Sequence, residues 1–548
     1  MATITGTISA AAPRRRSSVM EWLTTVDHKK IGLLYVWSAF LFFLAGGVLA
    51  LLIRLELSQP GMQVVDPEAY NQLFTMHGTT MIFLFIIPMF AGFGNYVVPI
   101  MIGARDMAFP RLNAFSYWLF LGSGVILYSS FLFERGASSA GWTGYTPLST
   151  TVFTPGAGTT IWILGLMLVG TSSLLGAINF MVTIVNMRCP GMTMTRIPLL
   201  AWAILATSIM VLFSTPVLTG ALIILLADRT GLTSIFSAAS GVDPRLWQHM
   251  FWFYSHPAVY IMILPAMGIV SEVLPVFSRK PIFGYKAIAY SSLAIAVMGF
   301  LVWAHHMFTT GIAPQLRAFF MIATMAIAVP TGVKIFNWIA TLWRGQLSFK
   351  TPLLFIFGFL TMFVIGGISG VFQAIVPIDT QIHDTYYVVG HLHYVLFGGA
   401  VFGIFSGLYY WLPKMTGWMM DERWGQLQFW LMLVGFNLTF FPMHLLGLMG
   451  MPRRIADYGA DFGWTRYNNL ATTGAFLIAA SALVFLINLY VSHERRTPAG
   501  NDPWEGNTLE WATSSPPLDY NFETIPTVHS ERPVRDMRMA NGLEPGAG

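Results

Sequence analysis

The sequence is poor in cysteine and in charge. It has one cysteine, Cys189, among 548 residues, and only 10% of its residues are charged. A single cysteine excludes a disulfide framework, an iron–sulfur cluster or a binuclear copper centre built within the chain. Ordinary soluble proteins have about 25% charged residues, so this composition excludes a soluble domain. The net charge of +5 is small for this length, and nucleic acid is not an expected partner.

The sequence contains long apolar runs. Hydrophobic residues make up 55% of the chain. About twelve stretches approach the ~20 apolar residues that cross a bilayer. They begin near Ile31, Phe74, Phe115, Thr160, Leu199, Trp247, Ala287, Ala318, Leu353, Val388, Trp424 and Ala471. We therefore predict an all-α integral membrane protein with about twelve transmembrane helices over residues 29–497, preceded by a segment 1–28 and followed by a polar tail 498–548.

Basic residues mark one side of the predicted bundle. Alternate loops are rich in arginine and lysine, beginning with Arg14, Arg15, Arg16, Lys29 and Lys30. The richer side is expected to be cytoplasmic. An even number of spans then places both termini on that side.

Histidines are the polar residues that stand out within the apolar runs. Six lie there: His77, His256, His305, His306, His391 and His393. A single such histidine would more often be a hydrogen-bonded core residue, but the direction of the spans places all six in the outer half of the membrane. Because polar groups in lipid are costly, this convergence indicates metal or cofactor ligands.

The spacing of these histidines indicates how they could bind metals. His391 and His393 point about 200° apart on a helix, so one helix could ligate two cofactors. Neutral imidazole is a ligand for haem iron and for copper. His256 and Tyr260 are four residues apart and share a face, where a phenol beside a ligand could supply an electron and a proton.

At these residues the sequence resembles subunit I of the bacterial A-type haem–copper terminal oxidases. The resemblance runs from Asp27 to the motif PWEGNTLEW, through TMHGTTMIF, HPAVY, VWAHHMFTTG, HDTYYVVGHLHYV and GMPRRIADY. It implies a catalytic domain that oxidises cytochrome c and reduces O₂ to water. It also implies proton translocation across the bacterial inner membrane, two haems, expected to be haem A, and one copper ion.

The resemblance assigns site residues. It implies that His77 and His393 bind the low-spin haem iron and that His391 binds the high-spin haem iron. The copper ligands would be His256, His305 and His306. Tyr260 would be joined covalently to His256. The remaining groups are Arg453 and Arg454 for haem propionates, Arg54 for the haem formyl group, His383 and Asp384 for magnesium or manganese, and Glu56 and Gly61 for calcium. Ala456 replaces an oxygen ligand that some members supply to the calcium.

Two proton paths are implied in the inner half. The lysine-linked path contains Lys334, Thr331 and Ser271, and the aspartate-linked path contains Asp106, Asn95, Asn113, Asn179, Ser172 and Ser173. Most relatives have a glutamate at the head of the second path, where this chain has Ala258. A subgroup has a Tyr-Ser pair upstream instead, which here is Tyr254 and Ser255.

Partners follow from the same resemblance. Quinol-oxidising relatives have an arginine, an aspartate and a histidine where this chain has Ala45, Leu49 and Ala69. Cytochrome c is therefore the expected donor, through a binuclear copper centre in subunit II, with subunit III and small accessory subunits. Two alternatives stay open: a nitric oxide reductase of the same superfamily, and a non-redox metal or solute transporter. A structural quinone-binding subunit would need a quinone-site signature, which the sequence does not show. Tyr260 and the lysine-linked path favour O₂ over nitric oxide.

Overall fold

The computed structural model describes residues 18–236 and 240–542. Arg14, Arg15 and Arg16 and the outer ends of the two predicted terminal segments lie outside these residues. Within the described part, regular secondary structure is helical, with only three isolated β-bridges.

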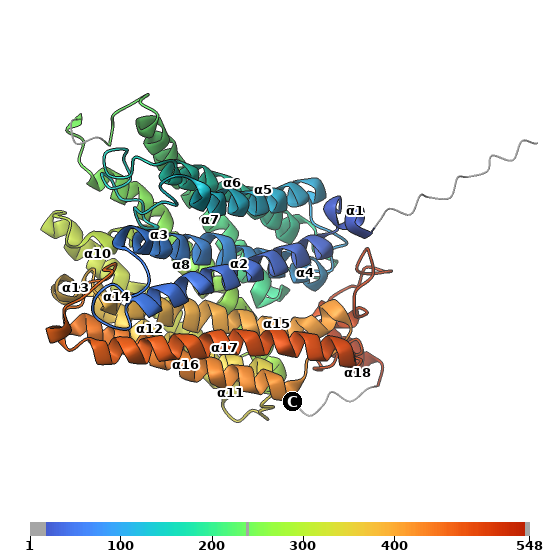
Figure 1. The fold of residues 1–548 in the computed structure, drawn as a ribbon. Helices are drawn as coiled ribbons and strands as arrows, with labels where there is room; N and C mark the ends of the chain where they lie inside the picture. Colours follow the sequence, from blue (N-terminus) through green and yellow to red (C-terminus); the bar gives the residue numbers. More distant parts are fainter. Residues whose placement is uncertain (1–17, 237–239, 543–548) are drawn as a thin grey trace, which may run out of the picture.

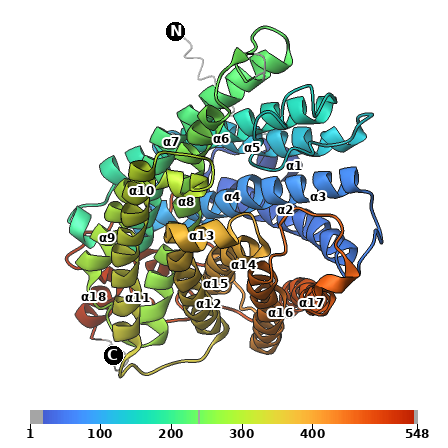
Figure 2. The same ribbon diagram turned by 90° about the vertical axis from the view of Figure 1, so that its left-hand side faces the viewer.

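Twelve helical segments are long and apolar enough to cross a membrane, which confirms the predicted fold class (Figures 1 and 2). They are α2 (His28–Glu56), α3–η1–α4 (Pro67–Thr79, Thr80–Ile86, Ile87–Met101), α5 (Pro110–Ser129) with η2 (Ser130–Leu132), α6 (Ala157–Asn186), α7 (Leu199–Arg229), α8 (Arg245–Phe277), α9–η5–η6 (Tyr285–Met298, Gly299–Leu301, Trp303–Met307), α10–α11 (Pro314–Ala326, Ala328–Leu342), α12 (Thr351–Ala374), α14–η7–α15 (Tyr386–Val395, Leu396–Val401, Phe402–Thr416), α16 (Glu422–Leu448) and α17 (Thr465–Arg495). The shorter elements are α1 (Ser18–Leu23), η3 (Met194–Arg196), α13 (Val376–Ile382), η8 (Ala460–Phe462), η9 (Leu509–Ala512) and α18 (Pro533–Ala540).

Helix starts are defined by local chemistry. Asp27, Asp66 and Asp421 precede α2, α3 and α16, and their carboxylates accept hydrogen bonds from backbone N–H groups of the first turn. Such caps satisfy donors that have no partner inside the helix. Proline occupies the first turn of α3 and α5, where its fixed φ suits the helix.

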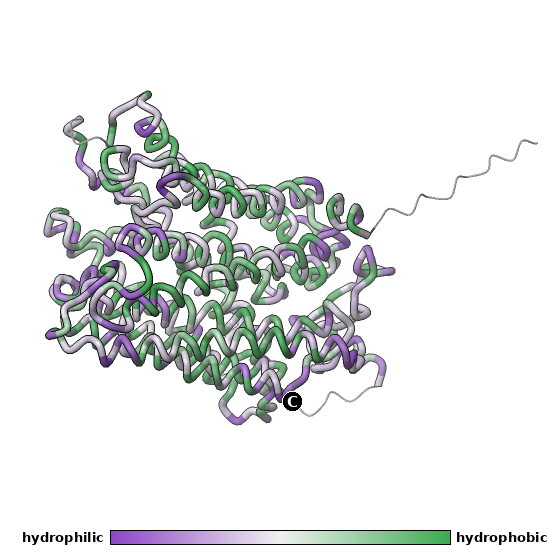
Figure 3. Tube along the Cα trace, viewed as in Figure 1, coloured by the Kyte–Doolittle hydropathy of each residue, from purple (hydrophilic) through white to green (hydrophobic). Residues whose placement is uncertain are grey.

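The two ends of the bundle differ from its middle. Apolar residues predominate along the central parts of the helices, and hydrophilic residues gather toward both ends (Figure 3). Helices α1 and α18 lie at one end, whereas α13 and the start of α14 lie at the other (Figure 1). An even number of spans places both ends of the described chain on the same side.

Helix irregularities follow the histidines along the chain. The π-helical segment η1 begins three residues after His77, and η7 begins three residues after His393. His305 and His306 lie on the 3₁₀ turn η6. Interruptions of this kind are frequent at functional sites.

The polar segment after α17 packs onto the end of the bundle. Trp504, Leu509, Glu510 and Trp511 are buried. Lys414 on α15 donates to backbone carbonyls of the segment, including Thr513 O at 2.7 Å. The segment therefore covers the helix ends although it has little regular structure.

Candidate functional site

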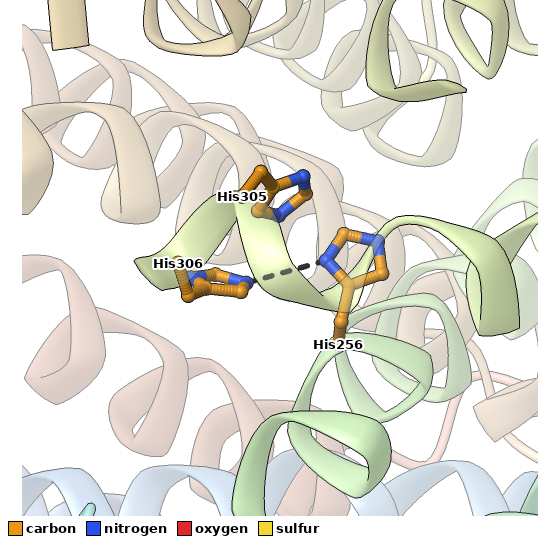
Figure 4. Close-up of side chains that lie close together, drawn as sticks. All are labelled: His256, His305 and His306. Carbon is orange, nitrogen blue, oxygen red and sulfur yellow. Dashed lines mark hydrogen bonds between the residues drawn. The ribbon is translucent and has the colours of Figure 1, made fainter. Parts of the chain in front are cut away.

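Three of the predicted ligands form a compact cluster. His256 comes from α8, and His305 and His306 come from η6 (Figure 4). One ligand atom from each lies within 4.8 Å of the others. His256 Nδ1 and His306 Nε2 are 3.3 Å apart and face each other. This arrangement of imidazoles suits a copper ion.

Neighbouring side chains orient two of these rings. Thr324 donates its hydroxyl proton to Phe320 O at 2.5 Å, so His305 Nδ1–H donates to Thr324 Oγ1, at 2.8 Å. His305 Nε2 is thereby left as the lone-pair nitrogen, as metal ligation requires. Trp252 stacks on His306 with ring centroids 3.7 Å apart and planes 8° apart. The sequence did not reveal Thr324 or Trp252, because threonine and tryptophan are ordinary residues of such helices.

His77 and His393 form a second pair. Their rings are 13° from parallel, with centroids 6.4 Å apart. Two metal–nitrogen bonds of about 2 Å each, plus the distances from nitrogen to ring centre, add up to about 6 Å. His77 Nδ1 donates to Gly46 O at 2.9 Å and His393 Nδ1 to Val389 O at 2.8 Å, so both Nε2 atoms are lone-pair nitrogens. The pair therefore fits a six-coordinate haem iron.

His391 lies on the same helix as His393 but contacts a different neighbour. Its Nδ1 donates to Gly366 O of α12 at 3.0 Å, and Ser369 Oγ is also 3.0 Å away. Its Nε2 is again the lone-pair nitrogen. Helix α14 thus presents one imidazole beside α12 and another near His77, as the two-residue spacing predicts.

Tyr260 lies beside the cluster of three histidines. The ring centroids of Tyr260 and His256 are 4.8 Å apart. His256 Nε2 is buried and has no hydrogen-bond partner in the described part of the chain. The geometry is compatible with a covalent bond between the two rings, which stays a prediction.

Two arginine sites were predicted for haem substituents. Arg54 is buried and donates through Nη2 to Asn468 Oδ1 at 2.9 Å, whereas its Nε and Nη1 have no partner among the described residues. These orphaned donors fit an acceptor on a bound group. Arg454 packs over Phe74, with Cζ 5.7 Å from the ring centroid, and burial lowers its pKa to about 10. An anionic haem propionate would stabilise this half-buried cation.

The predicted magnesium site contains an additional carboxylate. His383 Nδ1 contacts Asp379 Oδ2 at 2.9 Å, and its Nε2 is 3.9 Å from Asp384 Oδ2. Asp384 also accepts a hydrogen bond from Arg453 Nε at 2.7 Å. Burial acts to raise the pKa of Asp384, but Arg453 and His383 outweigh it and lower that pKa. Carboxylate oxygens suit manganese or magnesium, and the Asp379 carboxylate would orient the His383 ring.

The predicted calcium ligands already have protein partners. Glu56 is fully buried, and its carboxylate accepts three backbone N–H groups, from Gln63, Val64 and Val65, at 2.6–3.0 Å. The Gly61 carbonyl accepts from Gln63 Nε2 at 2.9 Å. These contacts account for Glu56 as the anchor of the loop after α2 without an ion. Calcium at this position stays a prediction that gains no support.

The lysine-linked residues lie between neighbouring helices. Lys334 is buried and donates to Ser292 Oγ at 2.6 Å and to Ile288 O at 3.1 Å, both on α9. Ser271 Oγ accepts from Trp338 Nε1 at 3.0 Å, and Thr331 Oγ1 donates to Ile327 O, just before the start of its own helix, at 3.1 Å. Ser292, not foreseen from the sequence, is the partner that holds the lysine within the bundle.

The aspartate-linked residues extend inward from the loop between α4 and α5. Burial raises the pKa of Asp106 in that loop to about 6. Asn179 Oδ1 accepts the Phe109 N–H at 2.9 Å, which fixes the loop on α6. Asn95 Oδ1, Asn113 Nδ2 and Ser255 Oγ are buried without partners in the described chain, a pattern typical of water-lined paths. Ser172 Oγ donates to Ser116 O, Ser173 Oγ donates to Val169 O, and Tyr254 is buried against Phe83.

The chain is similar in sequence and in fold to known proteins. Residues 30–477 match the family model described as cytochrome c and quinol oxidase polypeptide I. Cytochrome c oxidase subunit 1 of Synechocystis sp. is 55% identical over 522 residues, covering 95% of this chain and 93% of that protein. The subunit of the same name from Thermostichus vulcanus is 55% identical over 92% of this chain and 90% of its own length.

A more distant likeness concerns the fold alone. A solved heme-copper terminal oxidase dimer has a chain that aligns with a TM-score of 0.69 and 20% sequence identity, over 85% of this chain and 84% of that one. The family model covers most of the chain, including the spans that bear the six histidines, and the relatives exceed half identity over nearly its whole length. This protein therefore belongs to the cytochrome c and quinol oxidase polypeptide I family.

Proposed function

We propose that this chain is the catalytic subunit that reduces O₂ to water with electrons from cytochrome c and couples the reaction to proton translocation. One observation carries the proposal: the imidazoles form two separate groups. His391 and His393, both on α14, are assigned to different groups. A pair of near-parallel rings, His77 and His393, fits one haem. His391 and the cluster of His256, His305 and His306 fit a haem facing a copper ion.

Family membership implies haem and copper cofactors, and we propose haem A at both sites. His77 and His393 would hold the low-spin haem, His391 the high-spin haem, and the histidine cluster the copper. Arg54, Arg453 and Arg454 would bind haem substituents, and His383 and Asp384, with Asp379, would bind magnesium or manganese. When bound, the haems and copper carry electrons to O₂. Calcium at Glu56 and Gly61 would require the loop amides to release the carboxylate.

The chain's own residues would donate protons at the reduction site and relay protons toward it. Tyr260, beside His256, would donate a proton and an electron at the reduction site. Lys334 would relay protons toward Tyr260, past Thr331 and Ser271. Asp106 would collect protons at the loop surface for a path through Asn113, Asn95, Asn179, Ser172 and Ser173. With Ala258 in place of a carboxylate, Tyr254 and Ser255 would end this path, and a hydroxyl would relay a proton rather than store one.

The chain is a multi-pass membrane protein, and its family implies a complex with other subunits such as subunit II. We propose the bacterial inner membrane, with both termini cytoplasmic, because the basic loops lie on that side. Electrons would enter from cytochrome c through a binuclear copper centre in subunit II, since this chain has one cysteine. Subunit III and accessory subunits would complete the complex. The predicted boundaries at residues 28 and 497 would separate the catalytic bundle from its terminal segments.

The experiment is a reduced-minus-oxidised spectrum of the purified complex, with and without carbon monoxide. We expect two haem signals, of which only one shifts with carbon monoxide, and more iron than copper bound to this chain. Oxidation of cytochrome c with O₂ uptake should follow. Metal binding without a haem signal would instead support a transporter, and nitric oxide consumption without O₂ uptake would support a nitric oxide reductase.

A further inference from the structure

A small basic pocket lies where the C-terminal segment meets the end of α8, far along that helix from His256. Five cations line it, Arg279, Lys280, Arg532, Arg535 and Arg538, together with one acid, Glu505. All five cationic side chains are half-buried. Their charges are therefore partly removed from water, which is costly unless each charge has a partner.

Three of the five cations have protein partners. Arg279 pairs with Glu505 at 2.7 Å, and Arg538 pairs with Asp502 at 2.9 Å. Lys280 Nζ donates to the carbonyls of Ala340 at 3.0 Å and Trp343 at 2.5 Å. The Arg538–Asp502 pair joins α18 to the segment before it, and the Arg279–Glu505 pair joins that segment to the end of α8. The Lys280 bonds join the end of α8 to the end of α11.

The other two cations have no side-chain partner among the described residues. Arg532 and Arg535 make no side-chain hydrogen bond or ion pair that the described chain reveals. Burial and the charge of Arg535 lower the pKa of Arg532. Two acids act on that pKa in the opposite direction: Asp536, which accepts from Ser530 Oγ at 2.5 Å, and Glu531, which is exposed. The pocket thus has an excess of positive charge at two unpaired guanidinium groups.

We propose that this pocket binds a phosphate group, held by Arg532 and Arg535 and flanked by Arg279 and Arg538. A guanidinium presents a planar fork of N–H donors that matches the oxygens of a phosphate. The two guanidinium groups carry two positive charges, which a phosphate can balance and a single carboxylate cannot. A phosphate here would tie α18 to the bundle by replacing a repulsion between arginines with two attractions.

The phosphate belongs either to a lipid headgroup or to a soluble molecule, and both have the same recognition chemistry. Exposed aromatic residues lie close by: Trp343, whose carbonyl binds Lys280, and Phe283, two residues from the lining residue Pro281. Tryptophan is enriched at membrane interfaces, so the exposed Trp343 places a lipid phosphate within reach of the pocket.

The test uses the purified oxidase complex and hydrogen–deuterium exchange in the peptide containing α18. One arm compares nanodiscs of phosphatidylcholine, in which the choline cation cancels the phosphate charge, with nanodiscs containing phosphatidylglycerol, in which the phosphate charge is uncompensated. The other adds inorganic phosphate, with chloride of equal ionic strength as its control. At a ligand concentration ten times the dissociation constant, exchange should slow about tenfold, because stabilisation follows RT ln(1 + [L]/Kd). Slowing with phosphatidylglycerol alone identifies a lipid site, and slowing with phosphate identifies a soluble ligand.

The variant Arg532→Gln/Arg535→Gln should abolish the slowing, and the charge-matched variant Arg423→Gln/Arg466→Gln, at two exposed arginines, should retain it. Unchanged haem spectra would show that both variants fold. Equal exchange with every probe would overturn the proposal. Protection that is independent of added anion would also overturn it and would indicate an acidic segment of another subunit in the pocket.

Discussion

The imidazole of His391 lies directly against the backbone of Gly370 on α12. A Cβ atom added to Gly370 would be 2.8 Å from His391 Cε1, closer than real Cβ contacts. Gly370→Ala should therefore displace the proposed high-spin haem ligand, at a cost of about 1–3 kcal/mol. We expect a shifted or weakened carbon monoxide difference spectrum and an unchanged low-spin haem signal.

A matched control lies one turn earlier. A Cβ at Gly367 of the same helix would meet no atom within 4 Å, so Gly367→Ala should leave both haem signals unchanged. If both variants lose the carbon monoxide response equally, the cause is the helix and not the contact with His391.

Thr324→Val should weaken copper binding. The substitution removes the hydroxyl that fixes His305 Nδ1–H and leaves the volume of the side chain nearly unchanged. Loss of such a partner typically lowers metal affinity about 10–100-fold. Copper retained after chelator dialysis is the measurement. Thr361→Val on α12, whose hydroxyl bonds only to its own helix, should retain copper fully.

Lys334→Met should decrease turnover without unfolding the protein. Methionine fills a similar volume and removes a buried cation, so stability should be nearly unaffected. Proton transfer by a positioned group contributes about 100-fold or more, so O₂ uptake should fall by at least that factor. Turnover close to that of the unmodified enzyme would exclude Lys334 from the proton path. Lys350→Met, at an exposed lysine, is the control.

Asp106 should make stability depend on pH. Its pKa rises with burial from 3.8 to about 6, so the folded protein binds this proton more tightly than the unfolded chain does. Between these values the unfolded state has lost the proton and the folded state retains it, so the free energy of unfolding falls as pH rises. Thermal denaturation from pH 4 to pH 7 should show this decline, and Asp106→Asn should flatten it. If stability changed with pH equally in the unmodified protein and in Asp106→Asn, Asp106 would not be the source of the pH dependence.

The six histidines and the twelve spans could be predicted because lipid makes polar residues conspicuous and requires long apolar runs. The residues that position those histidines could not. Thr324, Ser369 and Ser292 are common residues of membrane helices, and only the packing of one helix on another brings them to His305, His391 and Lys334. Packing of the C-terminal segment was equally hidden, because Trp504, Leu509 and Trp511 are scattered among polar residues.

The π-helical turns after His77 and His393 are places where these two spans could lose a residue without a change in the direction of their histidines. A π turn holds one residue more than an α turn, so deleting a residue of η1 or η7 would allow the helix to become regular while keeping its apolar character. The regular turn would replace the π turn, and the parts of the helix on either side would keep nearly the same relative orientation. A deletion elsewhere in the same spans would instead rotate one part of the helix by about 100° relative to the other. Such a chain would still insert in a membrane, but a histidine beyond the deletion would face the wrong neighbours.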